Sequence, residues 1–173
     1  MAKRKKVVVA VSGGFDPIHI GHVRMFESAR ALGDELVVIL NNDNWLKKKK
    51  GFAFMPEKER KEVIEGLRAV DRVVLTNHTP NDKDMSVSRT LRAVNPAIFA
   101  NGGDRNEANA ADPNSSLCKD MHTCKELNID MIFNVGQGGK IQSSSWLLAK
   151  HFERAASARR PALTPRAKSR RKR

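Results

Sequence analysis

The chain has 173 residues, which supports one domain with a substantial core and leaves no room for a second of ordinary size. Of its 32 Lys and Arg residues, four lie in residues 3–6 and nine in residues 154–173, and neither stretch holds an acidic residue. The rest of the chain balances 19 basic against 19 acidic residues, so the sequence pI near 10.2 reflects the two ends. A neutral body lacks the basic stripe and stacking aromatic residues that nucleic-acid-binding domains show.

Cysteine usage and the N-terminal segment indicate the compartment. Cys118 and Cys124, with five residues between them, fit neither a CxxC motif nor a zinc pattern, so we expect two free thiols. The apolar run after the basic N-terminus is about a strand long, too short for a signal peptide or a membrane span. We therefore expect a cytoplasmic protein without a transmembrane segment.

Apolar runs of strand length alternate with segments of helical periodicity, which is typical of a parallel α/β sheet covered on both faces. Strands are predicted at residues 6–11, 35–40, 72–76, 97–100 and 130–135. Helices are predicted at residues 19–32, 56–69, 85–94, 116–127 and 143–156. Right-handed crossovers of these units give a doubly wound, five-stranded, Rossmann-like fold with ligands at the carboxyl ends of the strands.

Residues 157–173 contain Ala, Ser, Pro and basic residues, with Leu163 as the one large apolar side chain. They cannot bury enough surface to offset the entropy of ordering, so we expect a disordered basic tail after a domain that spans residues 1–156. As a polycation, this tail is expected to contact nucleic acid or anionic surfaces without specificity.

The most informative segment runs from Ser12 to His22, between the first predicted strand and the first predicted helix. Its glycines let the backbone approach a phosphate closely, and the helix N-terminus beyond them favours negative charge. His19 and His22 share one face of the opening helical turn. A single histidine here would be an ordinary surface or core residue, but six positions set together argue against chance. The arrangement suits a polyphosphate.

Three further segments follow predicted strand ends. Asn101-Gly102-Gly103-Asp104 allows the backbone to approach a base or ribose, although such a turn is weak evidence by itself. Ser143, Ser144 and Ser145, with Lys140, offer either a second anion site or a plain helix cap. The four lysines at residues 47–50 are either a solvated loop or a phosphate-binding loop over the strand ends.

Gly14-Phe15-Asp16, His19 and Gly21-His22 resemble the signature of the nucleotidyltransferases related to glycerol-3-phosphate cytidylyltransferase. That superfamily includes adenylyltransferases for heptose phosphate, phosphopantetheine and nicotinate mononucleotide. The resemblance covers residues 6–152. The serine run is similar to the motif that closes this family's active site. Some members carry an arginine just before or after these hydroxyls, where this chain has Lys140 and Lys150 nearby, and the replacement of that arginine by Lys140 stays open. The tetrapeptide at residues 19–22 also matches class I aminoacyl-tRNA synthetases, but the chain is too short for one.

The resemblance implies transfer of a nucleotidyl group from CTP or ATP to a phosphorylated small molecule, with pyrophosphate release and Mg²⁺ as cofactor. It implies that His19 and His22 stabilise the α-phosphate, that Lys49 or Lys50 closes over the transition state, and that Asp16 serves the metal or the acceptor. The implied nucleotide-binding residues are Gly13, Gly14, Phe15, Asp16, Gly21, Asn101, Gly102, Gly103, Asp104, Lys140, Ser143, Ser144 and Ser145.

Arg60 and Arg68 match the family's pattern for the acceptor pocket, although Arg68 could instead pair with an acid such as Asp71. The Gly-Gly-Asp turn favours a sugar-, polyol- or alcohol-phosphate acceptor. The alternatives are a nicotinate-mononucleotide or phosphopantetheine adenylyltransferase and, in another class, a nucleic-acid-binding or non-catalytic nucleotide-sensing protein. A homodimer stays open, as does the choice between CTP and ATP.

Overall fold

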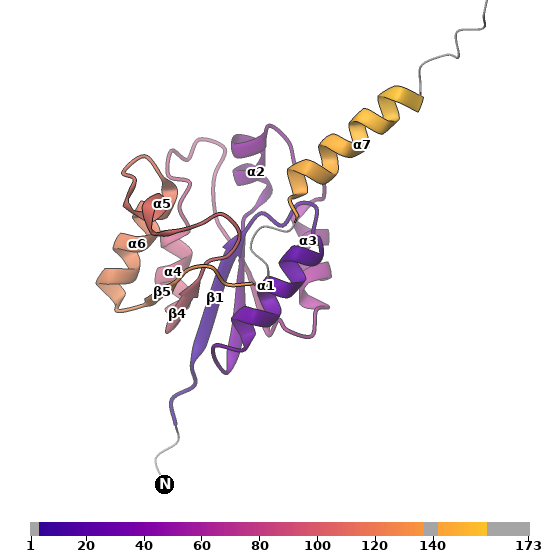
Figure 1. Ribbon diagram of the computed structural model, residues 1–173. Coiled ribbons are helices and arrows are strands. Elements are labelled where there is room, and N and C mark those ends of the chain that lie inside the picture. The colour runs from indigo at the N-terminus through magenta and orange to yellow at the C-terminus, as the bar shows by residue number, and fades with distance from the viewer. Residues whose placement is uncertain (1–3, 137–141, 159–173) are drawn as a thin grey trace, which may run out of the picture.

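The computed structural model describes residues 4–136 and 142–158. Its five strands form one parallel sheet with the order β3-β2-β1-β4-β5, as Figure 1 shows. The strands are β1 (Val8–Gly13), β2 (Glu35–Leu40), β3 (Arg72–Leu75), β4 (Ile98–Ala100) and β5 (Asp130–Ile132). The chain order reverses between β1 and β4, which confirms the predicted doubly wound α/β fold and places a switch point between these two strands.

Seven helices occur within the described residues. They are α1 (Ile20–Arg30), α2 (Asp43–Lys50), α3 (Glu57–Glu65), α4 (Ser88–Val94), α5 (Glu107–Ala111), α6 (Ser116–Leu127) and α7 (Ser144–Ala158). The last of these projects away from the body of the molecule (Figure 1). Residues 159–173, and with them most of the expected tail, lie outside the described residues.

Helix α2 corrects the expectation of a lysine loop. The Asn42 side chain accepts a hydrogen bond from the Trp45 backbone N–H and caps the helix start, and Gly51 ends it with a φ of 86°. Four lysines in the last turn match the negative end of the helix dipole. The two helix caps and the helix dipole outweigh the mutual repulsion of the four lysines. In the helix, the four lysine side chains point in different directions.

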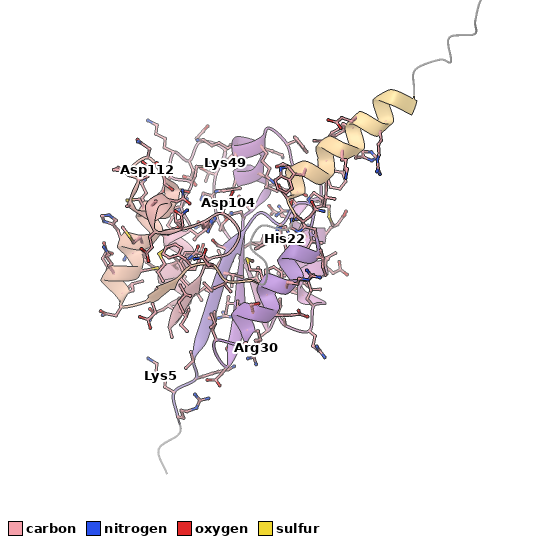
Figure 2. All side chains as sticks on the ribbon, viewed as in Figure 1. Lys5, His22, Arg30, Lys49, Asp104 and Asp112 are labelled. Carbon is pink, nitrogen blue, oxygen red and sulfur yellow. The ribbon has the colours of Figure 1, made fainter. Side chains whose placement is uncertain are left out.

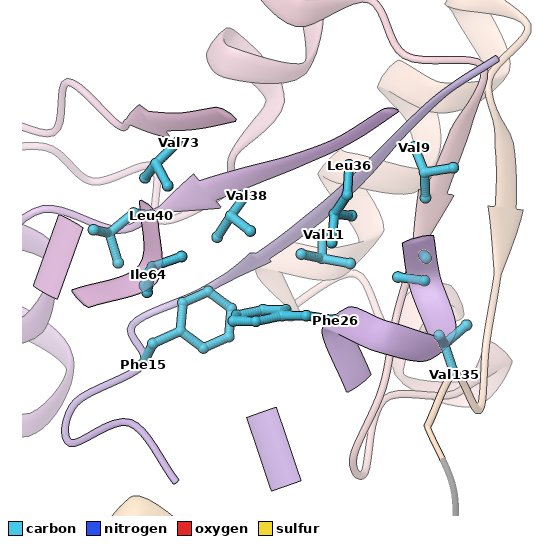
Figure 3. Packing of buried hydrophobic residues seen from close by; sticks show 12 residues of the cluster. Val9, Val11, Phe15, Phe26, Leu36, Val38, Leu40, Ile64, Val73 and Val135 are labelled. Carbon is cyan, nitrogen blue, oxygen red and sulfur yellow. The ribbon is translucent and has the colours of Figure 1, made fainter. Parts of the chain in front are cut away.

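The core has one part on each face of the sheet, because successive strand residues point to opposite sides. Val9 and Val11 of β1 pack with Phe26 of α1 and Ile64 of α3, and Figure 3 shows Phe15 closing this cluster. Ala10 faces the other side, in the cluster whose further members are Ile39, Val87, Leu91, Phe99, Ala110, Leu117, Cys124 and Ile129. This double burial holds the carboxyl ends of β1 and β4 side by side and so builds a fixed floor for a site.

Cys118 is half-buried and Cys124 is buried, and both are free thiols, as predicted. Within the part of the chain that the structure describes, no helix is long and apolar enough to cross a membrane.

Candidate active site

A cavity of about 290 Å³ opens at the carboxyl ends of β1 and β4, at the switch point. Most of the predicted site residues line it, namely Gly13, Gly14, Phe15, His19, Gly21, His22, Lys50, Gly102, Gly103, Asp104, Ser143, Ser144 and Ser145. They come from the end of β1, from the loops after β1, β4 and β5, from the starts of α1 and α7, and from the last residue of α2. The fold thus gathers segments that are more than 100 residues apart in sequence into one site.

His19 and His22 form a stacked pair at the start of α1, with ring centroids 3.6 Å apart. His19 is the N-cap residue, and its Nδ1 accepts from the Gly21 backbone N–H at 3.2 Å. The Nδ1 atom of His22 accepts from the His19 backbone N–H at 3.3 Å. Because each Nδ1 is an acceptor, the proton of each neutral ring sits on Nε2.

The protonation state of the pair follows from its surroundings. Burial lowers the pKa of His22 to about 3, helped by the charges of His19 and Lys50. Burial also lowers the pKa of His19. Both rings are therefore neutral hydrogen-bond donors at pH 7, next to a helix N-terminus that favours anions.

Tight packing explains the glycines of this turn. A Cβ on Gly13 would lie 2.7 Å from the Phe15 ring, and one on Gly14 would lie 2.7 Å from Leu46. The Phe15 ring packs edge-on against His22, with centroids 4.9 Å apart, and against Phe26. Phe15 thereby joins the turn before α1 to the core.

Only one of the two predicted lysines lines the cavity. Lys50 does so, and its Nζ donates to the Asp16 carbonyl at 3.4 Å. Burial lowers the pKa of this amine. Lys49, one residue earlier on α2, instead lines a separate hollow with Lys83 and Lys119. Figure 2 labels Lys49 beside α2, above Asp104. Of the two lysines predicted to bind phosphate, Lys50 therefore stays the candidate and Lys49 does not.

The structure corrects the roles expected for Asp16 and Arg60. Asp16 is 1% exposed, and its two carboxylate oxygens accept from the backbone N–H groups of Phe54 and Met55 at 2.7 and 2.8 Å. Arg60, also 1% exposed, donates to the carbonyls of Gly14, Asn41 and Met55 and to the Asp43 carboxylate. Both side chains make hydrogen bonds that hold loops in place, and both are buried. Neither is therefore available to a metal or an acceptor.

Arg68 lies apart from the cavity, in a surface hollow beside Glu27 and Arg30 of α1. Asp71 pairs with Arg30 at 3.0 Å and accepts from the Leu36 backbone N–H, and no ion pair among the described residues joins it to Arg68. The acceptor role expected for Arg68 is therefore also corrected.

Asn101 is 2% exposed and accepts from Arg105, so it supports the site from beneath. Beside it, a Cβ on Gly102 would lie 2.4 Å from the Val135 carbonyl, which requires glycine there. Ser144 donates from Oγ to the Pro17 carbonyl at 2.8 Å and so ties the start of α7 to the turn before α1. Lys140 lies outside the described residues.

The residues that the structure describes do not form a resident metal site. Both Asp16 oxygens are occupied, and the described ranges 4–136 and 142–158 hold no group of three or more His, Cys, Asp or Glu residues placed to share an ion. A Mg²⁺ ion bound to the phosphate oxygens of a triphosphate would not need such a group of side chains.

Seven residues that line the cavity are not among the predicted site residues, namely Ser12, Met25, Ala100, Arg105, Val135, Gly136 and Gln142. Of these, Arg105 is the one with a charged side chain. Arg105 directly follows the Gly-Gly-Asp turn, and this adjacency was the available signal. Its direction could not be inferred, because it depends on how β4 lies beside β1.

Residues 10–137 match the family model described as Cytidylyltransferase-like. The chain belongs to the cytidylyltransferase-like family. It is 39% identical over 107 residues to an FAD synthase of Thermococcus sibiricus, a match that covers 61% of this chain and 69% of that protein. It is 38% identical over 104 residues to the bifunctional protein HldE of Syntrophotalea carbinolica, covering 59% of this chain and 20% of that one.

Solved structures of this fold agree with the assignment. The lipopolysaccharide core biosynthesis protein from Thermoplasma volcanium superposes with a TM-score of 0.58 at 26% identity, covering 75% of this chain and 95% of that one. TmcAL of Thermotoga maritima, bound with alpha-thio ATP, superposes with a TM-score of 0.63 over 87% of this chain and 51% of its own, and at 14% identity it shows the fold alone. The predicted resemblance is confirmed: the chain is an enzyme of the nucleotidyltransferase type.

Proposed function

We propose that this enzyme transfers an adenylyl group from ATP to a phosphate monoester and releases pyrophosphate. The observation that carries the proposal is the pair of neutral histidine donors at the N-terminus of α1, facing a cavity with Lys50. The preference for ATP over CTP rests on the relatives named FAD synthase. Their matches span only 69% and 66% of their own length, so this preference is tested below.

The chemistry needs placement more than proton transfer. A phosphate oxygen of the acceptor, already anionic at pH 7, attacks the α-phosphorus of ATP. The bond from that phosphorus to the bridging oxygen breaks, and its electron pair leaves with pyrophosphate. The Nε2–H groups of His19 and His22 would donate to the α-phosphate and bridging oxygens as negative charge moves there, and Lys50 would neutralise the remainder.

The β- and γ-phosphates, carried as the Mg²⁺ complex of ATP, would lie at the start of α7. Ser143 and Ser145 line the cavity there, and Ser144 holds the helix start against Pro17. Hydroxyls and unpaired backbone N–H groups at a helix N-terminus are suited to binding phosphate groups.

Two acceptors deserve the first assays. FMN is favoured by the FAD synthases among the relatives, and a sugar phosphate is favoured by the relationship to HldE and by the Gly-Gly-Asp turn. The cytoplasm, where ATP and free thiols are both maintained, is the compartment that we propose.

The test is a pyrophosphate-release assay with ATP and CTP against FMN, sugar 1-phosphates, polyol phosphates, nicotinate mononucleotide and phosphopantetheine, with each product weighed by mass spectrometry. We expect one ATP–acceptor pair to be turned over at least tenfold faster than the same acceptor with CTP. Faster turnover with CTP would contradict the adenylyl preference. No pyrophosphate from any pair would contradict the proposed function.

A further inference from the structure

Arg105 bridges the two strands that flank the switch point. It lines the cavity, and its Nη1 donates to the Ser12 hydroxyl at the end of β1 and to the Asn101 Oδ1 after β4, both at 3.1 Å. Asn101 is itself held, because its Nδ2 donates to the Phe99 carbonyl at 3.2 Å. The guanidinium is therefore oriented by two fixed oxygens on the floor of the site.

The remaining donors of Arg105 are unused within the described residues. Its Nε and Nη2 make no hydrogen bond to any residue in 4–136 or 142–158. Burial lowers the pKa of Arg105, and the Asp120 and Asp104 carboxylates oppose this effect. Asp120, 3% exposed, is fixed by the Val87 backbone N–H and the Ser88 hydroxyl. Arg105 is a half-buried cation, and the planar pair of donors that has no partner among the described residues suits a phosphate group.

The geometry of the displacement decides which phosphate this is. The attacking oxygen and the leaving pyrophosphate must lie on opposite sides of the α-phosphorus. The start of α7, where the proposed function places the β- and γ-phosphates, is tied to Pro17 on the α1 side. The loop after β4 that carries Arg105 leads into α5, which lies to the left of the start of α7 in Figure 1, so the two segments reach the cavity from different directions.

We propose that Arg105 binds the phosphate group of the acceptor and holds it in line for attack. This inference rests on the proposed function and supplies the acceptor contact that neither Arg60 nor Arg68 can make. The acceptor class then becomes a phosphate monoester whose phosphate enters beside Ser12, whatever the rest of the molecule is. An alcohol of the same shape would lack the anion that this cation needs.

The experiment compares wild type with Arg105→Gln, Arg105→Lys and the control Arg92→Gln. Arg92 is an exposed arginine on α4 that pairs with Glu126, outside the cavity. Calorimetry measures the Kd of a non-hydrolysable ATP analogue. NMR of the arginine Nε–H signals measures the Kd of inorganic phosphate, the probe for the acceptor group, on free and on analogue-saturated protein.

For Arg105→Gln we expect phosphate affinity to fall at least tenfold while analogue affinity stays within threefold. Arg105→Lys keeps the charge but loses the planar fork, so its phosphate affinity should be intermediate. Arg92→Gln should change neither. The Arg105 Nε signal, identified by its loss in both variants, should shift as phosphate is added to wild type.

Equal phosphate affinity in wild type and Arg105→Gln, or no phosphate response in wild type, would overturn the inference. A loss that falls on the ATP analogue instead would make Arg105 a nucleotide ligand and would overturn it too. If Arg105→Gln does not fold, by its melting curve, Arg105→Lys decides in its place. Failure of the proposed function is separate: wild type would then not bind the ATP analogue, whatever its phosphate affinity.

Discussion

The stacked histidines show how backbone hydrogen bonds select a chemical role for a side chain. Each Nδ1 is occupied by a backbone N–H, and burial beside Lys50 disfavours a second proton. A charged imidazolium would carry a donor on both nitrogens and would break this arrangement. The pair is therefore built to donate from Nε2 across the whole physiological pH range.

One measurable consequence concerns the titration of His22. With its pKa lowered to about 3, the ring should stay neutral from pH 8 to pH 5. We expect its Cε1–H resonance in a ¹H NMR titration to move little over this range, and to titrate near 6.5 in urea-unfolded protein. A folded-state midpoint between pH 6 and 7 would contradict the lowered pKa and would show that the ring gains a proton within this pH range.

The buried carboxylate of Asp16 makes a second prediction at this scale. In Asp16→Asn the new amide N–H₂ would face a backbone N–H of Phe54 or Met55, so one buried donor would lose its acceptor. We expect the free energy of unfolding to fall by about 1–3 kcal/mol in urea denaturation. The exposed Asp130→Asn serves as the control. A change below about 0.5 kcal/mol would mean that the 52–55 loop is held by other contacts.

At the scale of elements, the helical conformation of α2 places two adjacent lysines in different surroundings. Because successive helical residues point about 100° apart, Lys50 lines the cavity while Lys49 lines the hollow shared with Lys83. A loop would not have given them such distinct surroundings.

The two lysines form a matched pair of variants. Lys50→Ala should lower kcat about 10²-fold, as expected for loss of a charge that stabilises the transition state, whereas Lys49→Ala should stay within threefold of wild type. Steady-state kinetics with the acceptor found in the screen gives both numbers. Equal losses would mean that α2 contributes a diffuse field and that neither lysine touches substrate.

Features that depend on neighbouring residues could be predicted from the sequence, whereas features that depend on contacts between distant residues could not. The strand at residues 35–40 and the helix at 116–127 were predicted to the residue, because strong apolar patterns and turn residues bound them. Helices α2 and α5 were missed, since both are short and polar and depend on Asn caps. The histidine motif lies within one short segment and could therefore be predicted from the sequence. The roles of Asp16 and Arg60 were not, because their partners, except Met55 for Arg60, lie 17 to 46 residues away.

At the scale of the whole molecule, a neutral body with charged ends suggests a division of labour. We propose that residues 1–156 form the catalytic domain and that the eight basic residues in 159–173 act only as a polycation. The cavity lies at the carboxyl ends of the strands, and every described residue that lines it precedes Trp146. Catalysis and polyanion binding should therefore be separable.

Truncation after Ala158 tests this division. We expect kcat to stay within about threefold, a change in barrier well under 1 kcal/mol. Retention of the full-length protein on non-specific nucleic acid should fall steeply with added salt, and it should vanish in the truncated protein. A large loss of turnover in a truncated protein that keeps its circular dichroism spectrum would assign the tail a role at the active site.

The central claim is that the cavity at the β1–β4 switch point is where nucleotidyl transfer occurs, driven by the histidine pair. The most direct test is the kcat of His22→Ala and His19→Ala, with the exposed His151→Ala of α7 as the control. Melting curves confirm that each variant is folded. We predict that kcat falls about 10²-fold or more in both active-site variants and is unchanged in the control. Turnover within threefold of wild type in folded His22→Ala would contradict the account.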